Sequence, residues 1–158
     1  MLFYIWIRFE WQFSLGAIIA IIHDVTITVG IFSFLSFEVN LSIVAAVLTI
    51  VGYSMNDTVV IFDRIRENLK KYSKVSISEI SNISTNETLS RTLITSLTTL
   101  LALFSIFIFG GAILKGFSFA MIIGVIVGTY SSIFVATPIL NYTNVSQKTV
   151  LKDTTDSD

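Results

Sequence analysis

The chain has little of what a soluble enzyme or a metal site needs. Its 158 residues include no Cys, one His and one Pro, and only 13% are charged. The absence of Cys excludes disulfides and thiolate metal ligands, and a single His argues against a His-based metal cluster. Soluble domains usually have about 25% charged residues, whereas 53% of this chain is hydrophobic. The composition therefore indicates an integral membrane protein with little soluble mass.

Motifs for nucleotide or nucleic-acid chemistry are also absent from the sequence. It contains no GxxxxGK[ST] phosphate-binding loop and no basic patch interleaved with aromatic residues, so we expect neither nucleotide hydrolysis nor nucleic-acid binding. Asp24 and Asp57 belong to different apolar segments, with no nucleophile or metal-ligand set around them. We therefore expect a protein that is not an enzyme and that needs no cofactor or metal.

Four segments are long and apolar enough to cross a bilayer, which takes about 20 helical residues. They are residues 13–36, 41–62, 93–109 and 117–140. We predict an all-α fold, a polytopic membrane helix bundle with four full transmembrane helices plus an N-terminal partial helix. The connections at 37–40 and 110–116 are short, so consecutive spans should be antiparallel neighbours, whereas the connection at 63–92 is long and polar.

The two ends of the chain differ from this transmembrane domain at 13–140. Residues 1–12 are predicted to be the stump of a transmembrane helix followed by a cytoplasmic turn, although the aromatic residues there also fit an interfacial anchor. Residues 141–158 are predicted to form a polar cytoplasmic tail.

The distribution of Lys and Arg predicts the orientation in the membrane. Lys115 is alone on one side of a four-span arrangement. Nine basic residues fall on the other side, namely Arg8, Arg64, Arg66, Lys70, Lys71, Lys74, Arg91, Lys148 and Lys152. We therefore expect both ends of the four-span core and the long connection to lie in the cytoplasm.

The long connection is expected to contain helix as well as loop. Residues 64–71 should continue the second helix past the membrane surface. Ile77, Ile80 and Ile83 recur every three residues, which predicts a short amphipathic helix on the membrane or on a partner, or else a solvated linker.

Ionisable residues within the spans are the main functional candidates, because a charge at the centre of a spanning helix costs roughly 2.5–3.5 kcal/mol. Asp57 and Asp24 lie in the second and first spans, and antiparallel packing should bring Asp57 and Arg91 to comparable depth. Desolvation and an opposite charge act in opposite directions on a carboxyl group, so small helix shifts would control its protonation. The simpler alternatives are a water-exposed Asp57, an Asp24 hydrogen bond to Thr28, and a satisfied polar role for His23.

Small and polar residues follow one face of each span, which is typical of helix contacts in lipid. In the last span a small residue recurs at every fourth position: Gly116, Ala120, Gly124, Gly128 and Ser132. Polar residues that accompany the ionisable ones are Tyr53 and Asn56 in the second span and Thr95 in the third.

Two long motifs occur in the sequence, GYSMNDTVVIFDRIREN at residues 52–68 and NETLSRT at residues 86–92. The first closely resembles the GYSxNDTVVxFDRIREN motif of SecF, an accessory subunit of bacterial protein export, and the second resembles the NxTLSRT motif of the same family. The His-Asp pair at 23–24 and the GTYSS run at 128–132 also match in order. The resemblance covers residues 4–140.

This resemblance implies a member of the resistance-nodulation-division superfamily in the bacterial inner membrane. It implies SecD, the SecYEG channel and YajC as partners, exported polypeptides as indirect partners, and use of the proton-motive force to promote export. Family residues that match Asp57 and Arg91 are implicated in proton movement, and Asp24 matches a frequent family acid. These three are the proton-relay candidates.

The family also has a first span and a periplasmic domain that have no counterpart here, so the sequence is expected to be N-terminally truncated. Two other functions stay open. One is a structural remnant or scaffold of the same complex that does not transduce energy. The other is a small proton-coupled solute transporter, although such transporters usually contain internal repeats and none is convincing here.

Overall fold

The computed structural model describes residues 11–36, 40–72, 75–143 and 145, and these contain helices and no strand. The helices are α2 (Trp11–Phe34), α3 (Leu41–Lys71), α4 (Ile77–Phe109), α5 (Gly111–Ser131), the π-helical η1 (Ser132–Ala136) and α6 (Thr137–Tyr142). Four helices are long and apolar enough to cross a membrane, the fourth being Gly111–Tyr142. The predicted all-α membrane bundle is confirmed, while the predicted N-terminal partial helix and most of the polar tail lie outside the described residues.

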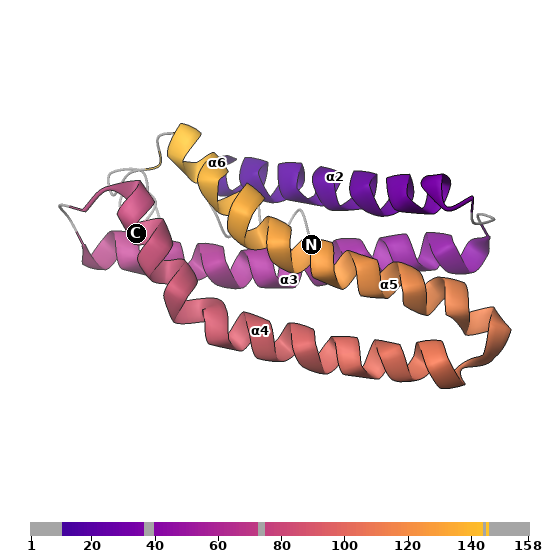
Figure 1. Cartoon of the computed structure of the whole chain (residues 1–158). Helices are drawn as coiled ribbons and strands as arrows, with labels where there is room; N and C mark the ends of the chain where they lie inside the picture. Colours follow the sequence, from indigo (N-terminus) through magenta and orange to yellow (C-terminus); the bar gives the residue numbers. More distant parts are fainter. Residues whose placement is uncertain (1–10, 37–39, 73–74, 144, 146–158) are drawn as a thin grey trace, which may run out of the picture.

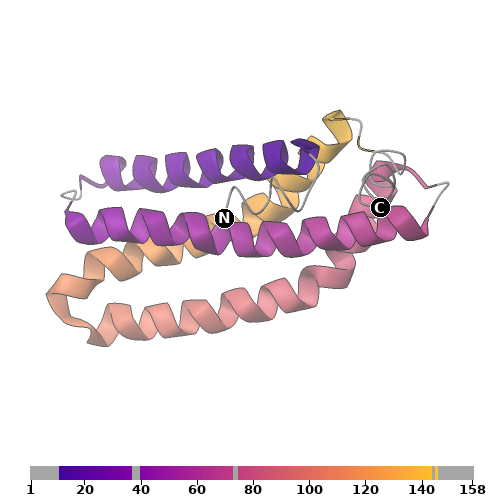
Figure 2. The ribbon, with the colours of Figure 1, turned by 180° about the vertical axis from the view of Figure 1, so that it is seen from behind.

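The four long helices alternate in direction (Figure 1). The last turn of α2, the first turn of α3 and the α4–α5 turn lie at one end of the bundle (Figures 1 and 2). The last turn of α3, the first turn of α4 and α6 lie at the other. Helix α3 packs against α2, α4 and α5, and η1 packs against α2 and α3. Helix α5 likewise packs against α2, α3 and α4, so α3 and α5 together join the bundle.

The α3 and α4 helices are longer than the apolar segments that predicted them. Their 31 and 33 residues correspond to about 46 Å and about 50 Å at 1.5 Å per residue, more than the ~30 Å hydrocarbon core. The expected extension of the second helix is present, because α3 continues to Lys71. Helix α4 begins at Ile77, where Ser76 caps its first turn by accepting a hydrogen bond from the Glu79 N–H.

The prediction of a separate amphipathic helix in the 63–92 connection is wrong. Residues 77–92 are continuous with the third span, and Ile80 is fully buried against the extension of α3, in a cluster with Phe62, Ile65 and Leu69. The three-residue spacing of the Ile residues predicted an apolar helix face but not the surface against which that face packs. The face packs against α3 of the same chain because α3 continues past its apolar segment.

The turn between α4 and α5 is tighter than the predicted 110–116 connection. Gly110 ends α4, where its N–H donates to the Ile106 carbonyl at 2.7 Å, and α5 begins at the next residue. Gly111 has a φ of +74°, in the left-handed region that Gly enters without steric cost. Two glycines therefore reverse the chain, and residues 112–116 are helical.

The last span contains a π-helical turn, η1, just before Pro138. Pro has no N–H and its ring clashes with the carbonyl four residues earlier, so an ordinary α-helical ladder cannot run through this position. The Thr137 hydroxyl donates to the Ser132 carbonyl at 3.0 Å, so this carbonyl has a hydrogen-bond partner inside the widened turn.

The buried core consists of two apolar clusters at the two ends of the bundle. One contains Phe13, Ala17, Ala20, Met55, Ile61, Phe62, Ile65, Leu69, Ile80, Ala136, Leu140 and Val145. The other contains Phe32, Ile43, Ala46, Ile50, Leu103, Ala120, Met121, Ile122 and Val125. Along α2, α3 and the last span, buried polar residues fall between the two clusters. That interval is where the candidate site lies.

Candidate functional site

A buried polar layer separates the two apolar clusters. We define it by Asp24 of α2, Ser54, Asp57 and Thr58 of α3, Ser131 of α5 and Ser132 of η1, each at most 4% exposed. Burying polar groups is unfavourable unless they form hydrogen bonds, so the partners of each group show how the layer is held.

Asp24 is the centre of this layer. Its Oδ2 accepts hydrogen bonds from Ser54 Oγ of α3 and, at 2.8 Å, from Ser131 Oγ of α5. His23 Nδ1 lies 3.0 Å from Oδ1, so the imidazole and the carboxyl group share a hydrogen bond. The expected bond to Thr28 is absent, and Thr28 Oγ1 has no hydrogen-bond partner among the described residues. Asp24 therefore joins three helices rather than capping its own turn.

A second hydrogen bond across the layer joins α3 to the π-helical turn. Thr58 Oγ1 and Ser132 Oγ lie 2.9 Å apart, and Thr58 also donates to the Ser54 carbonyl at 3.2 Å. Ser132 donates to the Gly128 carbonyl at 2.8 Å. The hydroxyl groups of the layer are thus tied both to their own helices and to the neighbouring ones.

Asp57 differs from Asp24 in having unsatisfied hydrogen-bonding capacity. It is 4% exposed, and its Oδ2 has no hydrogen-bond partner in the part of the chain that the structure describes. Arg91 of α4 acts on the Asp57 carboxylate through space. The two side chains form no hydrogen bond or ion pair within 4.0 Å, and Arg91 itself is exposed. A carboxyl group that has a charged neighbour but no direct contact with it can change both its protonation state and its ion-pair partner.

The predicted supporting polar residues have different surroundings. The Tyr53 hydroxyl donates to Thr99 Oγ1 at 3.2 Å and joins α3 to α4. Thr95 donates at 3.0 Å to the carbonyls of Arg91 and Thr92 within its own helix. Asn56 is exposed and faces away from the polar layer. Of the three, Tyr53 forms a hydrogen bond between helices.

The predicted packing stripe on the last span faces α3. A Cβ added at Gly124 would overlap the Ile50 side chain, and one at Gly128 would lie 3.1 Å from Ser54 Cβ. Ala120 and Ser132 are fully buried, whereas Gly116 is half-buried at the start of the stripe. This close approach brings Ser131 within reach of the Asp24 carboxylate that Ser54 also contacts.

The ends of α3 and α4 are joined by a group that we call the α3–α4 clamp: Arg64, Asn68, Ser84 and Glu87. Arg64 Nε donates to Glu87 Oε2 at 2.7 Å, and Asn68 Nδ2 donates to the same oxygen at 2.8 Å and to Ser84 Oγ at 2.9 Å. These groups lie outside the apolar parts of the two helices. Hydrogen bonds from Asn68 and Arg64 lower the pKa of Glu87, which stays charged near neutral pH.

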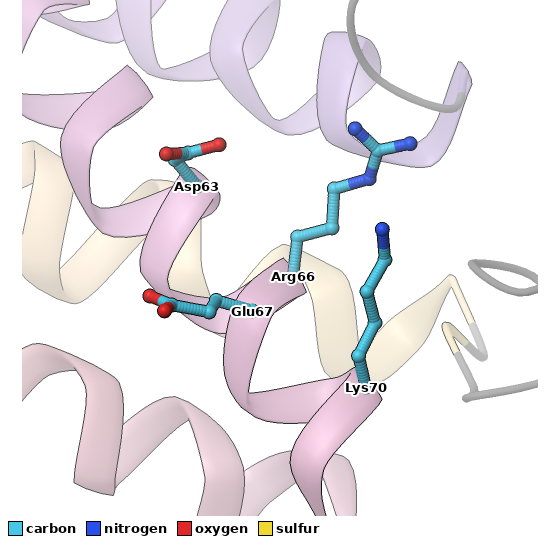
Figure 3. A pocket seen from close by; sticks show the side chains of 4 residues that line it. All are labelled: Asp63, Arg66, Glu67 and Lys70. Atoms are coloured by element: carbon cyan, nitrogen blue, oxygen red, sulfur yellow. The ribbon is translucent and has the colours of Figure 1, made fainter. Parts of the chain in front are cut away.

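A shallow pocket on the extension of α3 is lined by Asp63, Arg66, Glu67 and Lys70. Figure 3 shows that the Arg66 and Lys70 side chains extend to the same side of the helix. Because acids and bases alternate along it, the pocket presents no single charge to a ligand. We do not assign the site there.

Several residues of the polar layer were not anticipated. Ser54, Thr58 and Ser131 all lie in the motifs quoted above, but Ser and Thr in helices commonly bond to their own backbone. Ser131 and Asp24 are 107 positions apart, and no periodicity within one helix indicates such a contact.

Fold and site together define a polytopic helical membrane protein with buried carboxyl groups at its centre. A family model described as "Protein export membrane protein SecD/SecF, C-terminal" matches residues 1–146. The chain belongs to this family.

Relatives with curated names agree with this assignment. The chain is 53% identical over 156 residues to "Protein translocase subunit SecF" of Rhodobacter capsulatus, a match that covers 99% of this chain and 47% of the relative. It is 59% identical over 143 residues to the protein of that name from Rhodothermus marinus, covering 87% and 46%. The chain therefore spans about half the length of these relatives.

Solved structures show the same fold. A crystal structure of SecDF from Thermus, described as a translocon-associated membrane protein, superposes with a TM-score of 0.86 at 46% identity. The match covers 91% of this chain and 20% of that one. A structure of SecDF in a super-membrane-facing form also gives a TM-score of 0.86, at 44% identity, with 99% and 21% coverage.

Proposed function

We propose that the chain serves as the membrane part of an accessory subunit of the bacterial Sec protein-export machinery. In this role it works with SecD and uses the proton-motive force to promote polypeptide translocation across the inner membrane. Family membership and the names of the relatives support the export role. SecYEG and YajC are proposed as further partners, with both ends of the four-span core in the cytoplasm.

The observation that carries the proton-coupling part is the state of Asp57. A buried carboxylate with an unpaired oxygen is unfavourable, and binding a proton removes the charge. Arg91 is the counter-charge nearby, and Asp24, which joins three helices, is the second proton-relay candidate. A membrane potential supplies roughly 2.3 kcal/mol per charge per 100 mV, enough to bias a helix rearrangement.

The direct test replaces Asp57 with Asn in the chain's native membrane assembly and measures export driven by a proton gradient. We expect Asp57→Asn to reduce export to the level seen without a gradient, because the amide cannot carry the proton. Asp63→Asn is the matched control, since Asp63 is an exposed acid on the same helix, and it should preserve export.

Undiminished export by Asp57→Asn would remove Asp57 from the mechanism and leave the scaffold as the better description. Loss of export in both variants, with normal assembly, would show that the effect is not specific to the buried acid.

A further inference from the structure

The α3–α4 clamp lies on the same helical seam as Asp57 and Arg91. Glu87 precedes Arg91 by four residues on α4, so the two side chains share a helix face. Arg64 follows Asp57 by seven residues on α3, about two turns along the same side. The bond between Arg64 and Glu87 therefore lies about two helical turns from Asp57 along the same seam, in the direction of the α3–α4 connection.

Glu87 is a second possible partner for Arg91. A Glu four residues before a basic residue is in the favourable order for an ion pair within a helix. In this structure Glu87 is instead held by Arg64 and Asn68, and the Arg91 guanidinium forms no ion pair with a described residue. Arg91 thus follows Glu87 by one helical turn on α4 and forms an ion pair with neither Glu87 nor Asp57.

The two carboxylates differ in their environments. Asp57 is buried in the polar layer, whereas the Glu87 side chain is 36% exposed and accepts two hydrogen bonds. Hydrogen bonds from Asn68 and Arg64 lower the pKa of Glu87 and keep it ionised. The positive charges that act on Glu87, those of Arg64 and Lys71, both come from α3. Glu87 is suited to be a permanent anion and Asp57 to be the group that changes charge.

We propose that Glu87 is a positioning residue of the proton-coupling site. It is the alternative counter-ion that takes Arg91 when Asp57 is protonated and returns it when Asp57 is charged. In the structure Arg64 and Asn68 hold Glu87 away from this exchange, and Arg91 is paired with neither carboxylate. This inference rests on the proposed function, because it assigns Glu87 a part in the same proton cycle.

The test compares two variants. One carries the single change Glu87→Gln, and the other, the charge-swapped pair, carries Arg64→Glu and Glu87→Arg together. Glu67→Gln is the matched control, because Glu67 also accepts a hydrogen bond from Arg64 but lies on α3 itself. Two properties are measured in each variant: export driven by a proton gradient, and the distance between spin labels on introduced Cys at exposed positions 70 and 82. The chain has no native Cys, so labelling is specific.

We expect Glu87→Gln to keep the label distance, since the amide oxygen still accepts from Arg64 and Asn68, and to lower export by roughly two- to thirtyfold, the range typical of residues that act through another. The charge-swapped pair should also keep the distance, yet its export should stay low because Arg at 87 repels Arg91. Glu67→Gln should match the parent chain in both measurements.

Full export by Glu87→Gln, or recovery of export in the charge-swapped pair, would show that Glu87 only fastens the two helices and would overturn the proposal. Asp57→Asn, measured in the same assay, separates this failure from failure of the proposed function. If Asp57→Asn loses export and Glu87→Gln does not, the role of Glu87 alone is wrong.

Discussion

Two buried aspartates in this bundle are stabilised in different ways. Asp24 has hydrogen bonds at both oxygens, from His23, Ser54 and Ser131. Asp57 has an oxygen without a partner among the described residues. A carboxylate that is fully bonded rigidifies its surroundings, whereas one that is incompletely bonded depends on proton uptake or on the movement of a partner.

Replacing Ser131 with Ala should lower the free energy of unfolding by about 1–3 kcal/mol, because a buried carboxylate loses one of its donors. Ser105→Ala is the matched control, since Ser105 is exposed and donates only to the Leu101 carbonyl of its own helix. Chemical unfolding in detergent micelles measures both. Equal stabilities would mean that the Asp24 contact contributes nothing to the fold.

At the scale of elements, the close packing of α5 on α3 determines whether the polar layer forms. Gly124 faces Ile50, and Gly128 faces Ser54. Gly128 lies one turn before Ser131, whose hydroxyl donates to Asp24. Small residues let helix backbones approach in lipid, where polar side chains then bond across the interface. Helices α3 and α5 can therefore lie this close together because Gly124 and Gly128 have no side chain.

Gly124→Ala should destabilise the bundle by about 1–3 kcal/mol, because the new methyl group overlaps the Ile50 side chain. Gly30→Ala is the control within α2, where an added Cβ meets nothing within 4 Å. It should be neutral or stabilising by about 0.5–1 kcal/mol, the usual gain of Ala over Gly in a helix. Thermal unfolding in detergent distinguishes the two, and equal effects would contradict the packing described here.

At the scale of the whole molecule, the polar layer lies between two apolar clusters and the α3–α4 clamp closes one end. Three helices meet in the layer, while the clamp adds α4 through Glu87 and Ser84. Large apolar side chains such as Leu48, Leu97 and Ile113 remain exposed on the outside, as expected for surfaces that face lipid tails. The molecule is thus polar in its middle and apolar around it.

The clamp predicts a specific pH dependence of stability. Its hydrogen bonds lower the pKa of Glu87 below the ordinary value of 4.5. A carboxylate with a lowered pKa stabilises the fold above that value, and this contribution is lost as the pH falls through the folded-state pKa. We expect the melting temperature of the parent chain to exceed that of Glu87→Gln at neutral pH, with a difference that shrinks below pH 4.5. A constant difference in acid would contradict this assignment.

Much of the helical architecture was predictable because lipid imposes strong rules. A spanning helix must be long and apolar, so the four segments, their order and their alternation in direction follow from the pattern of residues. The continuity of residues 77–92 with the third span was not predictable in this way, because the residue pattern there predicted a separate short amphipathic helix or a solvated linker. Tertiary contacts of Ile80 and Ser84 with α3 make that segment part of the bundle.

The sequence by itself determined that this chain crosses a membrane with acids inside its spans, and its motifs indicated the family. Only the tertiary structure decided which groups those acids meet. Asp24 is bonded by serines from two other helices, Asp57 is left incompletely bonded, and Arg91 acts on Asp57 without contacting it. The reason is physical: periodicity specifies the face a residue occupies on its own helix, whereas the partner depends on how helices cross, and small residues such as Gly124 set that crossing.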